Sequence, residues 1–272
     1  MVSFPNCKIN IGLRVVGKRT DGFHDIETVF APVELKDALE IAEQATGNNE
    51  LSFNQTGLKI PGTDNDNLCL KAYHLLKNDF PQLPALRIHL HKAVPMGAGL
   101  GGGSADASFM LKLLNKKFNL ALADEQLVSY ALKLGSDCPF FIINKPCYAT
   151  GRGEMLEEIS LDLSGYKIIL INPDIHINTA WAFSKVNIEA NRLPLKELIA
   201  LPPASWQQHI FNDFEKPVFD EHPEIAEIKT TLIEQGAVYA SMSGSGSTVF
   251  GIFEKKAGPA IKFPAHYFWK WV

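Results

Sequence analysis

Apolar and polar residues alternate strictly along the chain from Cys7 to Val16. The odd positions through Val15 are apolar, and the even positions carry Lys8, Asn10 and other polar or small residues. A period of two predicts a β-strand with one buried face and one polar face. Lys8 and Asn10 therefore point to the same side, away from the apolar set.

Other stretches of the N-terminal half show either this period of two or the spacing of a helix. A turn at residues 20–22 leads into an apolar stretch at 26–30, and residues 86–90 alternate again, so we expect two more strands. The helix-capping residue types at 64–67 and the glycine-rich stretch before residue 105 each precede helical spacing. The apolar positions of these two helices are Leu68, Ala72, Leu75 and Leu76, and then Phe109, Met110, Leu113 and Leu114. A third helix is expected to end near Leu134.

A charged stretch after residues 151–154, Gly-Arg-Gly-Glu, predicts the end of a first domain. We expect an N-terminal domain at residues 1–155 and a C-terminal domain at 156–272. The apolar run Ile168–Ile171 predicts a buried strand that opens the second domain. Because strands and helices are mixed without a regular βαβ rhythm, the predicted fold class is α+β.

The C-terminal domain has three further signals. Apolar spacing at residues 225–232 predicts a helix, and a turn rich in glycine and serine leads into a strand at 249–253. The aromatic tail at 267–272 fits either a closing strand or a contact surface, and the sequence does not decide between them.

Composition narrows the classes of partner. The formal net charge is −4, so the chain lacks the overall positive charge that holds nucleic acid. The N-terminus has no signal-peptide pattern and no apolar run approaches the roughly 20 residues of a membrane span, so we expect a cytoplasmic protein with no membrane partner. The four cysteines are far apart, which is typical of reduced core thiols. No heptad or symmetric patch stands out, so the sequence does not fix the oligomeric state beyond the expectation of a monomer or a weak homodimer.

The densest chemical signal is a glycine-rich loop directly before a predicted helix. It consists of Pro95, Met96, Gly97, Ala98, Gly99, Leu100, Gly101, Gly102, Gly103, Ser104 and Ala105. Glycines allow positive φ angles and let an anion approach the backbone, where N–H groups and the helix N-terminus attract it. The loop therefore predicts a phosphate site.

Two familiar phosphate-binding motifs fit this loop poorly. A Walker A motif requires a lysine before its final Ser or Thr, but Gly103 precedes Ser104 here. The spacing Gly97-x-Gly99-x-x-Gly102 matches a dinucleotide fingerprint, although Asp124, near the position of a ribose-binding acid, is better explained as a helix start.

Three segments together resemble the signature motifs of the GHMP kinases, a family of small-molecule kinases. The loop sequence Pro-Met-Gly-Ala-Gly-Leu-Gly-Gly-Gly-Ser-Ala is similar to the second motif, residues 7–13 to the first, and residues 241–250 to the third. The segments 21–24, 134–141 and 151–154 resemble one branch of the family, whose acceptor is an alcohol that carries a cytidyl diphosphate.

This resemblance implies a two-domain fold, with an N-terminal domain like ribosomal protein S5 and an α/β C-terminal domain. It also implies ATP as phosphoryl donor with Mg²⁺. ATP would be bound by the loop from Pro95 to Ala105, with Asn67 and Lys92 beside the nucleotide. Ser104 is the expected Mg²⁺ or phosphate contact, because its hydroxyl is one of few side-chain oxygens in the loop. As a residue at a helix start, it also fits a plain N-cap.

The resemblance assigns catalysis to Lys8 and Asp137. An ammonium at Lys8 can stabilise charge on the acceptor oxygen and the phosphoryl group. Asp137 precedes Pro139 in a turn, where its carboxylate can accept the hydroxyl proton as a general base. A solvated strand lysine and a turn-forming or capping aspartate are the structural alternatives.

The implied partner is a small cytidyl-diphosphate substrate. By resemblance, Phe23, His24 and Phe183 lie near cytosine, since aromatic rings stack on pyrimidines and histidine bonds to their edges. Asn10, Thr179 and Asp137 would contact the acceptor hydroxyls or the diphosphate. Phe23 stands where tyrosine is common, and the negative charge of Asp106 at a phosphate site has no explanation in the sequence.

Three other interpretations remain at this point. A GHMP kinase with another alcohol as acceptor would not need the Gly-Phe-His segment at 22–24, because only a member that recognises a cytidyl group needs it. An RNA-binding module with the S5-like fold would need a basic surface. A dinucleotide-dependent dehydrogenase has no support beyond the glycine spacing. A kinase for a cytidyl-bearing alcohol accounts for the most residues.

Overall fold

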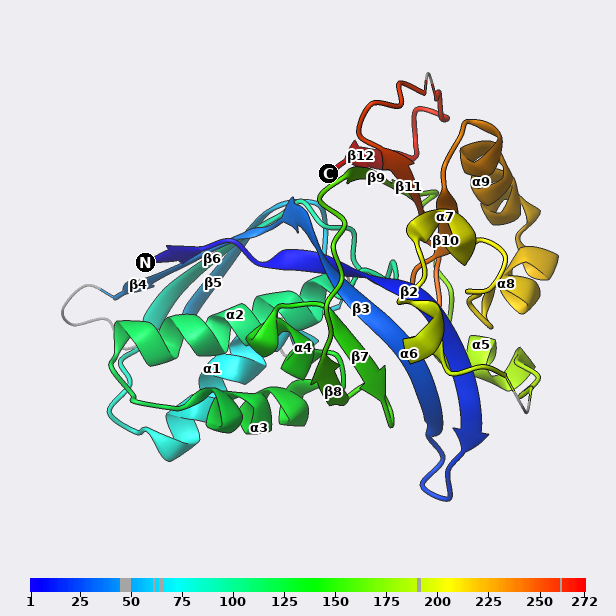
Figure 1. Cartoon of the computed structure of the whole chain (residues 1–272). Helices are drawn as coiled ribbons and strands as arrows, with labels where there is room; N and C mark the ends of the chain where they lie inside the picture. Colours follow the sequence, from blue (N-terminus) through cyan, green and yellow to red (C-terminus); the bar gives the residue numbers. More distant parts are fainter. Residues whose placement is uncertain (45–49, 61, 64–65, 190–191, 260) are drawn as a thin grey trace. The chain divides into compact units, whose positions relative to one another are not determined.

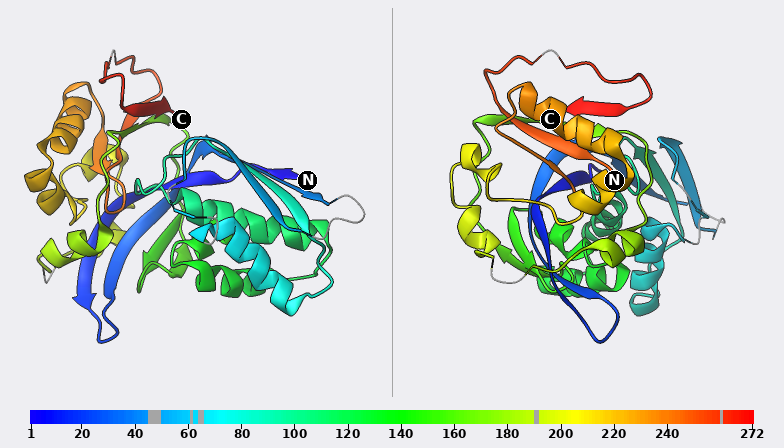
Figure 2. Two further views of the ribbon diagram at one scale, coloured as in Figure 1. Left: turned by 180° about the vertical axis from the view of Figure 1, so that it is seen from behind. Right: turned by 90° about the vertical axis from the view of Figure 1, so that its right-hand side faces the viewer.

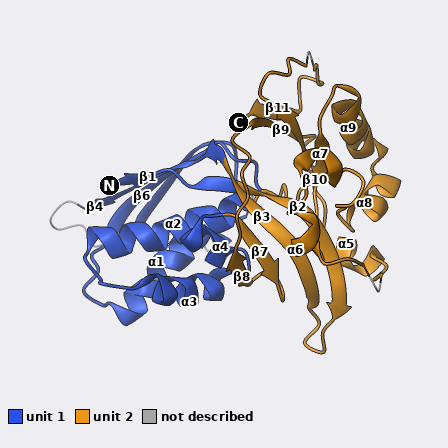
Figure 3. Ribbon diagram, viewed as in Figure 1, with its two compact units in different colours: residues 1–7, 34–96, 101–145 blue, residues 8–33, 97–100, 146–272 orange. Residues whose placement is uncertain are grey.

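The computed structural model describes residues 1–44, 50–60, 62–63, 66–189, 192–259 and 261–272. The chain forms two compact units that interleave along the sequence (Figure 3). Unit 1 comprises residues 1–7, 34–96 and 101–145, and unit 2 comprises 8–33, 97–100 and 146–272. The strands and helices are labelled in Figure 1. The predicted domain boundary near residue 155 stays a prediction.

Unit 1 contains a four-stranded sheet in the order β1-β4-β6-β5. The strands are β1 (Val2–Ser3), β4 (Ala38–Glu43), β5 (Ser52–Gly57) and β6 (Leu86–Lys92). The alternation predicted at 86–90 is confirmed, because Leu86, Ile88 and Leu90 are buried and Arg87 is exposed. β6 pairs antiparallel with β4 and parallel with β5.

Helices cover one side of this sheet, as seen from the front in Figure 1 and from behind in the left view of Figure 2. They are α1 (Leu68–Asp79), α2 (Gly102–Lys117), α3 (Asp124–Leu134) and the short α4 (Cys138–Ile143). Asn67 caps α1, because its side-chain oxygen accepts the backbone N–H groups of Cys69 and Leu70. The other candidate caps, Asp64 and Asn65, lie outside the described residues. The predicted helix start at Asp124 is confirmed.

Unit 2 holds most of a second sheet, in the order β2-β3-β7-β8. Its strands are β2 (Asn6–Lys18), β3 (His24–Lys36), β7 (Cys147–Thr150) and β8 (Met155–Glu158). The first strand predicted from sequence is confirmed as β2, but its expected polar face is wrong. Lys8 is 3% exposed and Asn10 is 1% exposed, so both faces of the strand are buried there. Their polar atoms are paired within the protein, which offsets the cost of burial.

The third sheet has the order β10-β11-β9-β12 and is antiparallel throughout. It consists of β9 (Tyr166–Asn172), β10 (Tyr239–Met242), β11 (Val249–Glu254) and β12 (Phe268–Trp271). The aromatic tail is therefore a closing strand. The helices of unit 2 are α5 (Thr179–Lys185), α6 (Leu195–Leu198), α7 (Pro203–Trp206), α8 (Glu215–Glu221) and α9 (Pro223–Glu234). The predicted helix at 225–232 is α9, whose buried side packs on β10 and β11.

The expected α+β class is confirmed, since helices and strands are mixed in both units. The segment 151–154, interpreted as a domain end, forms the turn between β7 and β8. All four cysteines are buried as thiols. Among the described residues, no helix combines the length and the apolar character of a membrane span.

Candidate active site

The glycine-rich loop leads into α2 through a left-handed residue. Gly101 precedes the helix with φ 68°, a conformation that glycine adopts without the steric cost of a side chain. The first intrahelical bond runs from the N–H of Ala105 to the carbonyl of Gly101 at 2.9 Å. The N–H groups of Gly102, Gly103 and Ser104 thus lie in the first turn, where helical geometry provides no intrahelical acceptor and an anion is favoured. This geometry suits a phosphate.

A buried ion cluster lies beneath this turn. The ammonium of Lys92 bonds to Asp37 and, at 2.7 Å, to Asp106, and the Lys92 side chain has no exposed surface. The other oxygen of Asp37 accepts the backbone N–H groups of Ala93 and Val94 at 2.6 and 2.9 Å. The cluster therefore ties the end of β6 and the start of the loop to the first turns of α2.

The cluster explains why an aspartate at position 106 is tolerated beside a phosphate site. Burial raises the pKa of the Asp106 carboxyl to about 8, against the opposing effect of Lys92. Burial disfavours the Lys92 ammonium, but the charges of Asp106 and Asp37 outweigh it and raise the pKa of Lys92. Lys92, predicted beside the nucleotide, is thus held by two carboxylates in the interior.

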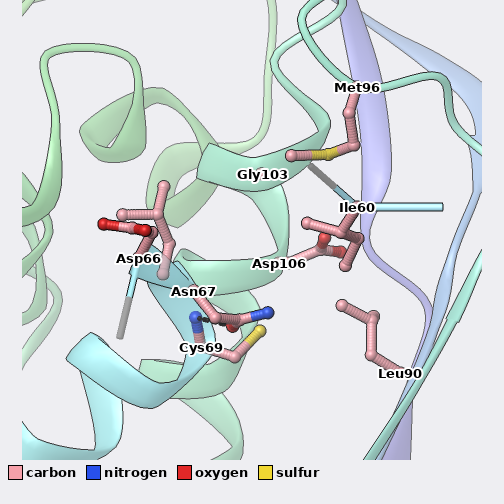
Figure 4. A pocket seen from close by; sticks show the side chains of 9 residues that line it. Ile60, Asp66, Asn67, Cys69, Leu90, Met96, Gly103 and Asp106 are labelled. Atoms are coloured by element: carbon pink, nitrogen blue, oxygen red, sulfur yellow. Dashed lines mark hydrogen bonds between the residues drawn. The ribbon is translucent and has the colours of Figure 1, made fainter. Parts of the chain in front are cut away.

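A cavity opens next to this cluster (Figure 4). Asn67, Met96, Gly103 and Asp106 line it together with Ile60, Asp66, Leu68, Cys69 and Leu90. The side-chain oxygen of Asn67 is occupied by the α1 cap, so its amide nitrogen is the group that remains for another acceptor. Among the described residues, the Oδ1 atom of Asp106 is buried without a hydrogen-bond partner. The cavity therefore combines apolar walls with a few polar atoms, as ligand pockets do.

Asp137 and Ser104 belong to neighbouring parts of unit 1. Asp137 directly precedes α4, and within the described residues its carboxylate makes no capping hydrogen bond to that helix. The hydroxyl of Ser108 lies 2.8 Å from the carbonyl oxygens of both Ser104 and Cys138. This contact joins the first turn of α2 to the residue that follows Asp137.

In unit 2, Lys8 and Asn10 form a buried pair on β2. The Lys8 ammonium donates to Oδ1 of Asn10 at 2.6 Å and lies 4.9 Å from the centre of the Phe30 ring. The amide nitrogen of Asn10 donates to the Thr28 hydroxyl at 2.9 Å. The alternative of a solvated strand lysine is therefore wrong, because Lys8 is buried and held in one place.

The three segments that resemble family motifs meet at Ser243. The backbone N–H of Asn10 donates to the Ser243 hydroxyl at 3.2 Å, and this hydroxyl donates to the Gly99 carbonyl at 2.8 Å. The N–H of Thr248 also donates to the carbonyl of Ala98 at 3.3 Å. Residues 97–100 of the loop are thus fixed to the turn between β10 and β11.

The aromatic residues expected near cytosine all belong to unit 2, and two of them, His24 and Phe183, are in contact. His24 stacks on Phe183 with ring centres 4.7 Å apart and planes 13° from parallel. The rings of Phe183 and the buried Phe214 lie at right angles with centres 4.8 Å apart, so Phe183 contacts both the core and His24. Phe23 is 53% exposed, with the guanidinium of Arg152 4.9 Å from its ring centre. The Thr179 hydroxyl lies 3.0 Å from that of Ser245.

Comparison with known proteins decides the family. The model of the GHMP kinases N terminal domain matches residues 67–145, and the model of the GHMP kinases C terminal domain matches residues 195–265. The chain belongs to the GHMP kinase family.

Relatives of this GHMP kinase carry a more specific name. A protein of Bacteroides fragilis named 4-diphosphocytidyl-2-C-methyl-D-erythritol kinase is 52% identical over 253 residues, which cover 93% of this chain and 92% of the relative. A protein of the same name from Azobacteroides pseudotrichonymphae is 48% identical over 271 residues, which cover 98% of this chain and 100% of the relative.

Solved structures agree with the assignment of the fold. A crystal structure of 4-(cytidine 5'-diphospho)-2C-methyl-D-erythritol kinase superposes with a TM-score of 0.79 at 30% identity, covering 93% of this chain and 90% of that one. A mevalonate kinase of Methanococcus jannaschii has the same fold, with a TM-score of 0.66 at 14% identity over 94% of this chain and 92% of that one.

The residues of this GHMP kinase fit a magnesium ion that arrives with a nucleotide. Among the described residues, no three His, Cys, Asp or Glu side chains gather as a metal site. Mg²⁺ in kinases typically takes one or two protein oxygens and otherwise phosphates and water, so a protein cage is unnecessary. In unit 1, Ser104 and Asp137 carry side-chain oxygens of the type that Mg²⁺ prefers.

Sequence reasoning missed three residues that hold predicted site residues in place. Asp37 anchors Lys92, Thr28 holds Asn10, and Ser243 joins Asn10 to the loop. Ser243 lies within the segment that resembles the third family motif, so the sequence could have indicated it as a site residue. Thr28 and Asp37 fit ordinary strand patterns, and nothing in the sequence marks them as site residues.

Proposed function

We propose that this GHMP kinase transfers the γ-phosphoryl group of ATP to the 2-hydroxyl of 4-diphosphocytidyl-2-C-methyl-D-erythritol. The products are ADP and the 2-phosphate, in the non-mevalonate route to isoprenoid precursors. The acceptor assignment rests on the names of the curated relatives, at 52% identity for one of them. The stacked pair of His24 and Phe183 is the structural observation that carries it, because these side chains suit a pyrimidine ring.

Asp137 is the general base and Lys8 the electrostatic stabiliser in this proposal. The Asp137 carboxylate takes the proton of the acceptor hydroxyl as its oxygen forms a bond to the γ-phosphorus. The bond from the γ-phosphorus to the β,γ-bridging oxygen breaks, and ADP leaves with the electron pair. The Lys8 ammonium stabilises the negative charge that builds up on the transferring group.

The nucleotide is bound by unit 1 and by the glycine-rich loop. The loop from Pro95 to Ala105 surrounds the phosphates with its backbone N–H groups between Met96 and Ser104, and Ser104 contacts phosphate or the Mg²⁺ that accompanies ATP. The Asn67 amide meets the base in the cavity of Figure 4, where its nitrogen can donate to a ring nitrogen of adenine. Because Lys92 is buried, its role is to position α2 rather than to touch the nucleotide.

The acceptor is bound mainly by unit 2. Cytosine contacts Phe23, His24 and Phe183, and Asn10 and Thr179 contact the methylerythritol hydroxyls or the diphosphate. In the predicted division of the chain, residues 1–155 bind ATP and residues 156–272 contribute to the acceptor side. We infer that the enzyme acts in the cytoplasm as a monomer or weak homodimer, without nucleic-acid or membrane partners.

A coupled ADP-release assay with ATP and Mg²⁺ tests the proposal. The cytidyl substrate is compared with mevalonate and homoserine, and wild type with Asp137→Asn and Lys8→Ala. We expect turnover on the cytidyl substrate alone and its loss in both variants. Turnover on another alcohol would discard the acceptor, and variants with wild-type turnover would discard the assigned roles. Absence of turnover on all three substrates by folded protein would overturn the proposal.

A further inference from the structure

We propose that Thr28 is a positioning residue for phosphoryl transfer, which holds the Asn10 amide in the single orientation that presents its oxygen to the Lys8 ammonium. Thr28 lies on β3 and is completely buried. The inference rests on the proposed role of Lys8 in catalysis.

The direction of each hydrogen bond follows from the chemistry of the groups. The Thr28 hydroxyl lies 2.5 Å from the backbone carbonyl oxygen of Gly12, which can only accept. The single hydroxyl proton is therefore used on Gly12, and the Thr28 oxygen presents lone pairs to Asn10. The Asn10 atom 2.9 Å away must then be the donor, Nδ2.

This assignment leaves Oδ1 of Asn10 facing Lys8, at 2.6 Å from the ammonium nitrogen. An ammonium is a donor with no acceptor capacity, so it requires the amide oxygen. If the amide rotated by 180°, its NH₂ group would face the ammonium and its oxygen would face a hydroxyl oxygen whose proton is already used. Thr28 therefore excludes the orientation that would repel Lys8.

Ser243 fixes the backbone of Asn10 in a complementary way. Its hydroxyl accepts the Asn10 N–H at 3.2 Å and donates to the Gly99 carbonyl at 2.8 Å. The Ser243 hydroxyl also lies 3.4 Å from Oδ1 of Asn10. Ser243 thus places the main chain of Asn10 and approaches the oxygen of its amide, and Thr28 accepts from the nitrogen of that amide. Asn10 is 1% exposed. If the Thr28 hydroxyl were removed, the amide nitrogen of Asn10 would lose its acceptor in a place that water does not easily reach.

The orientation of the Asn10 amide should affect the reaction more than the stability of the fold. An ammonium that stabilises a transition state must be held close to its productive position, and a misplacement of about 1 Å costs roughly 100-fold in rate. Thr28 supplies this constraint through Asn10. Removing the hydroxyl should therefore lower kcat while the binding of both substrates changes little.

Thr28→Val tests this, because valine keeps the branched shape and removes the hydroxyl. We expect kcat to fall by about 10- to 100-fold with both KM values within about threefold of wild type. Thr28→Ser retains the hydroxyl and should restore kcat to within about threefold. Tyr148→Phe is the matched control, since it removes a hydroxyl bond to Glu27, the neighbour of Thr28 on β3, without touching Asn10. It should leave kcat unchanged.

A double-mutant cycle with Asn10→Ala separates positioning from general stability. If Thr28 acts through Asn10, Thr28→Val should cost less than about twofold in kcat once Asn10 is alanine. Additive losses, or a valine variant with wild-type kcat and an unchanged melting temperature, would overturn the inference. If Thr28→Val does not fold, Thr28→Cys provides a similar volume with a weakly hydrogen-bonding thiol, and the same loss of kcat is expected.

Lys8→Ala distinguishes this inference from the proposed function. If Lys8→Ala loses turnover while folded Thr28→Val keeps it, only the role of Thr28 fails. If Lys8→Ala itself retains turnover, the proposed role of Lys8 fails and the positioning role of Thr28 with it.

Discussion

Gly99 lies against Ser243 so closely that no side chain fits between them. A Cβ atom on Gly99 would stand 1.9 Å from the carbonyl oxygen of Ser243, and the φ angle of Gly99 is +78°. The obstacle is backbone, which cannot rotate away as a flexible side chain can. Loop residues 97–100 and the turn after β10 are therefore packed together with a glycine between them.

Gly99→Ala should consequently damage both stability and turnover. We expect the free energy of unfolding to fall by about 2–4 kcal/mol, since a steric clash and an unfavourable φ angle act together. Urea unfolding followed by circular dichroism measures the loss. Gly165→Ala is the control, because nothing lies within 4 Å of the added atom and its φ angle is outside the left-handed region. Equal stability of the two variants would contradict the packing described for Gly99.

The Lys92 cluster provides a second test of stability. Lys92→Met removes the buried cation and leaves the buried carboxyl groups of Asp37 and Asp106 without their partner. Breaking a buried ion pair in this way typically costs about 3–5 kcal/mol. Chemical denaturation should show a loss of that size, whereas Lys216→Met, which removes an exposed pair with Asp220, should change stability by less than about 1 kcal/mol. Similar effects of both substitutions would show that the cluster is unimportant.

The pKa of Asp106 predicts a dependence of stability on pH. Its folded-state pKa is raised by burial to about 8, from 3.8. Between these values the folded protein binds more protons than the unfolded chain, so stability decreases as pH rises from about 4 to 8. The raised pKa of Lys92 lies above this window, so that ammonium stays protonated throughout it.

In the wild type, the melting temperature should fall as pH rises from about 5 to 8, within that window, and Asp106→Asn should make this fall smaller. Thermal unfolding at several pH values measures the slope for the wild type and the variant. Asp162→Asn is the control, because Asp162 is exposed and its pKa is lowered, so its titration lies below this window. An unchanged slope in Asp106→Asn would show that another group titrates.

Local patterns predicted the elements of this fold well, because those elements depend on neighbours in sequence. The cap of α1 at Asn67 and the alternation of β6 involve residues within four positions of each other. The same reasoning failed for β2, whose polar positions are buried. Their partners lie in distant segments, as with Asn10 and Ser243, which are 233 residues apart.

The candidate site shows the same limit. The loop from Pro95 to Ala105 is visible in sequence because its composition is unusual and its chemistry is local. Asp37 and Lys92 are 55 residues apart, and nothing in the sequence around Asp37 distinguishes it from a strand-end aspartate. Thr28 likewise occupies a position where a β-branched residue suits any strand. Their roles depend on tertiary contacts, which a single sequence does not reveal.

The stacked pair of His24 and Phe183 leads to the last prediction, which concerns recognition of the acceptor. Phe183→Leu keeps apolar volume against Phe214 and removes the flat ring that meets His24. Stacking of a base on an aromatic ring contributes about 1–3 kcal/mol, so KM for the cytidyl substrate should rise by about 5- to 150-fold. KM for ATP should stay unchanged, because the cavity proposed for the adenine base belongs to unit 1. Phe263→Leu, in another stacked pair of unit 2, should leave both KM values as in wild type. A rise in KM for ATP instead would mean that Phe183 serves the nucleotide, and no change in either would remove it from the site.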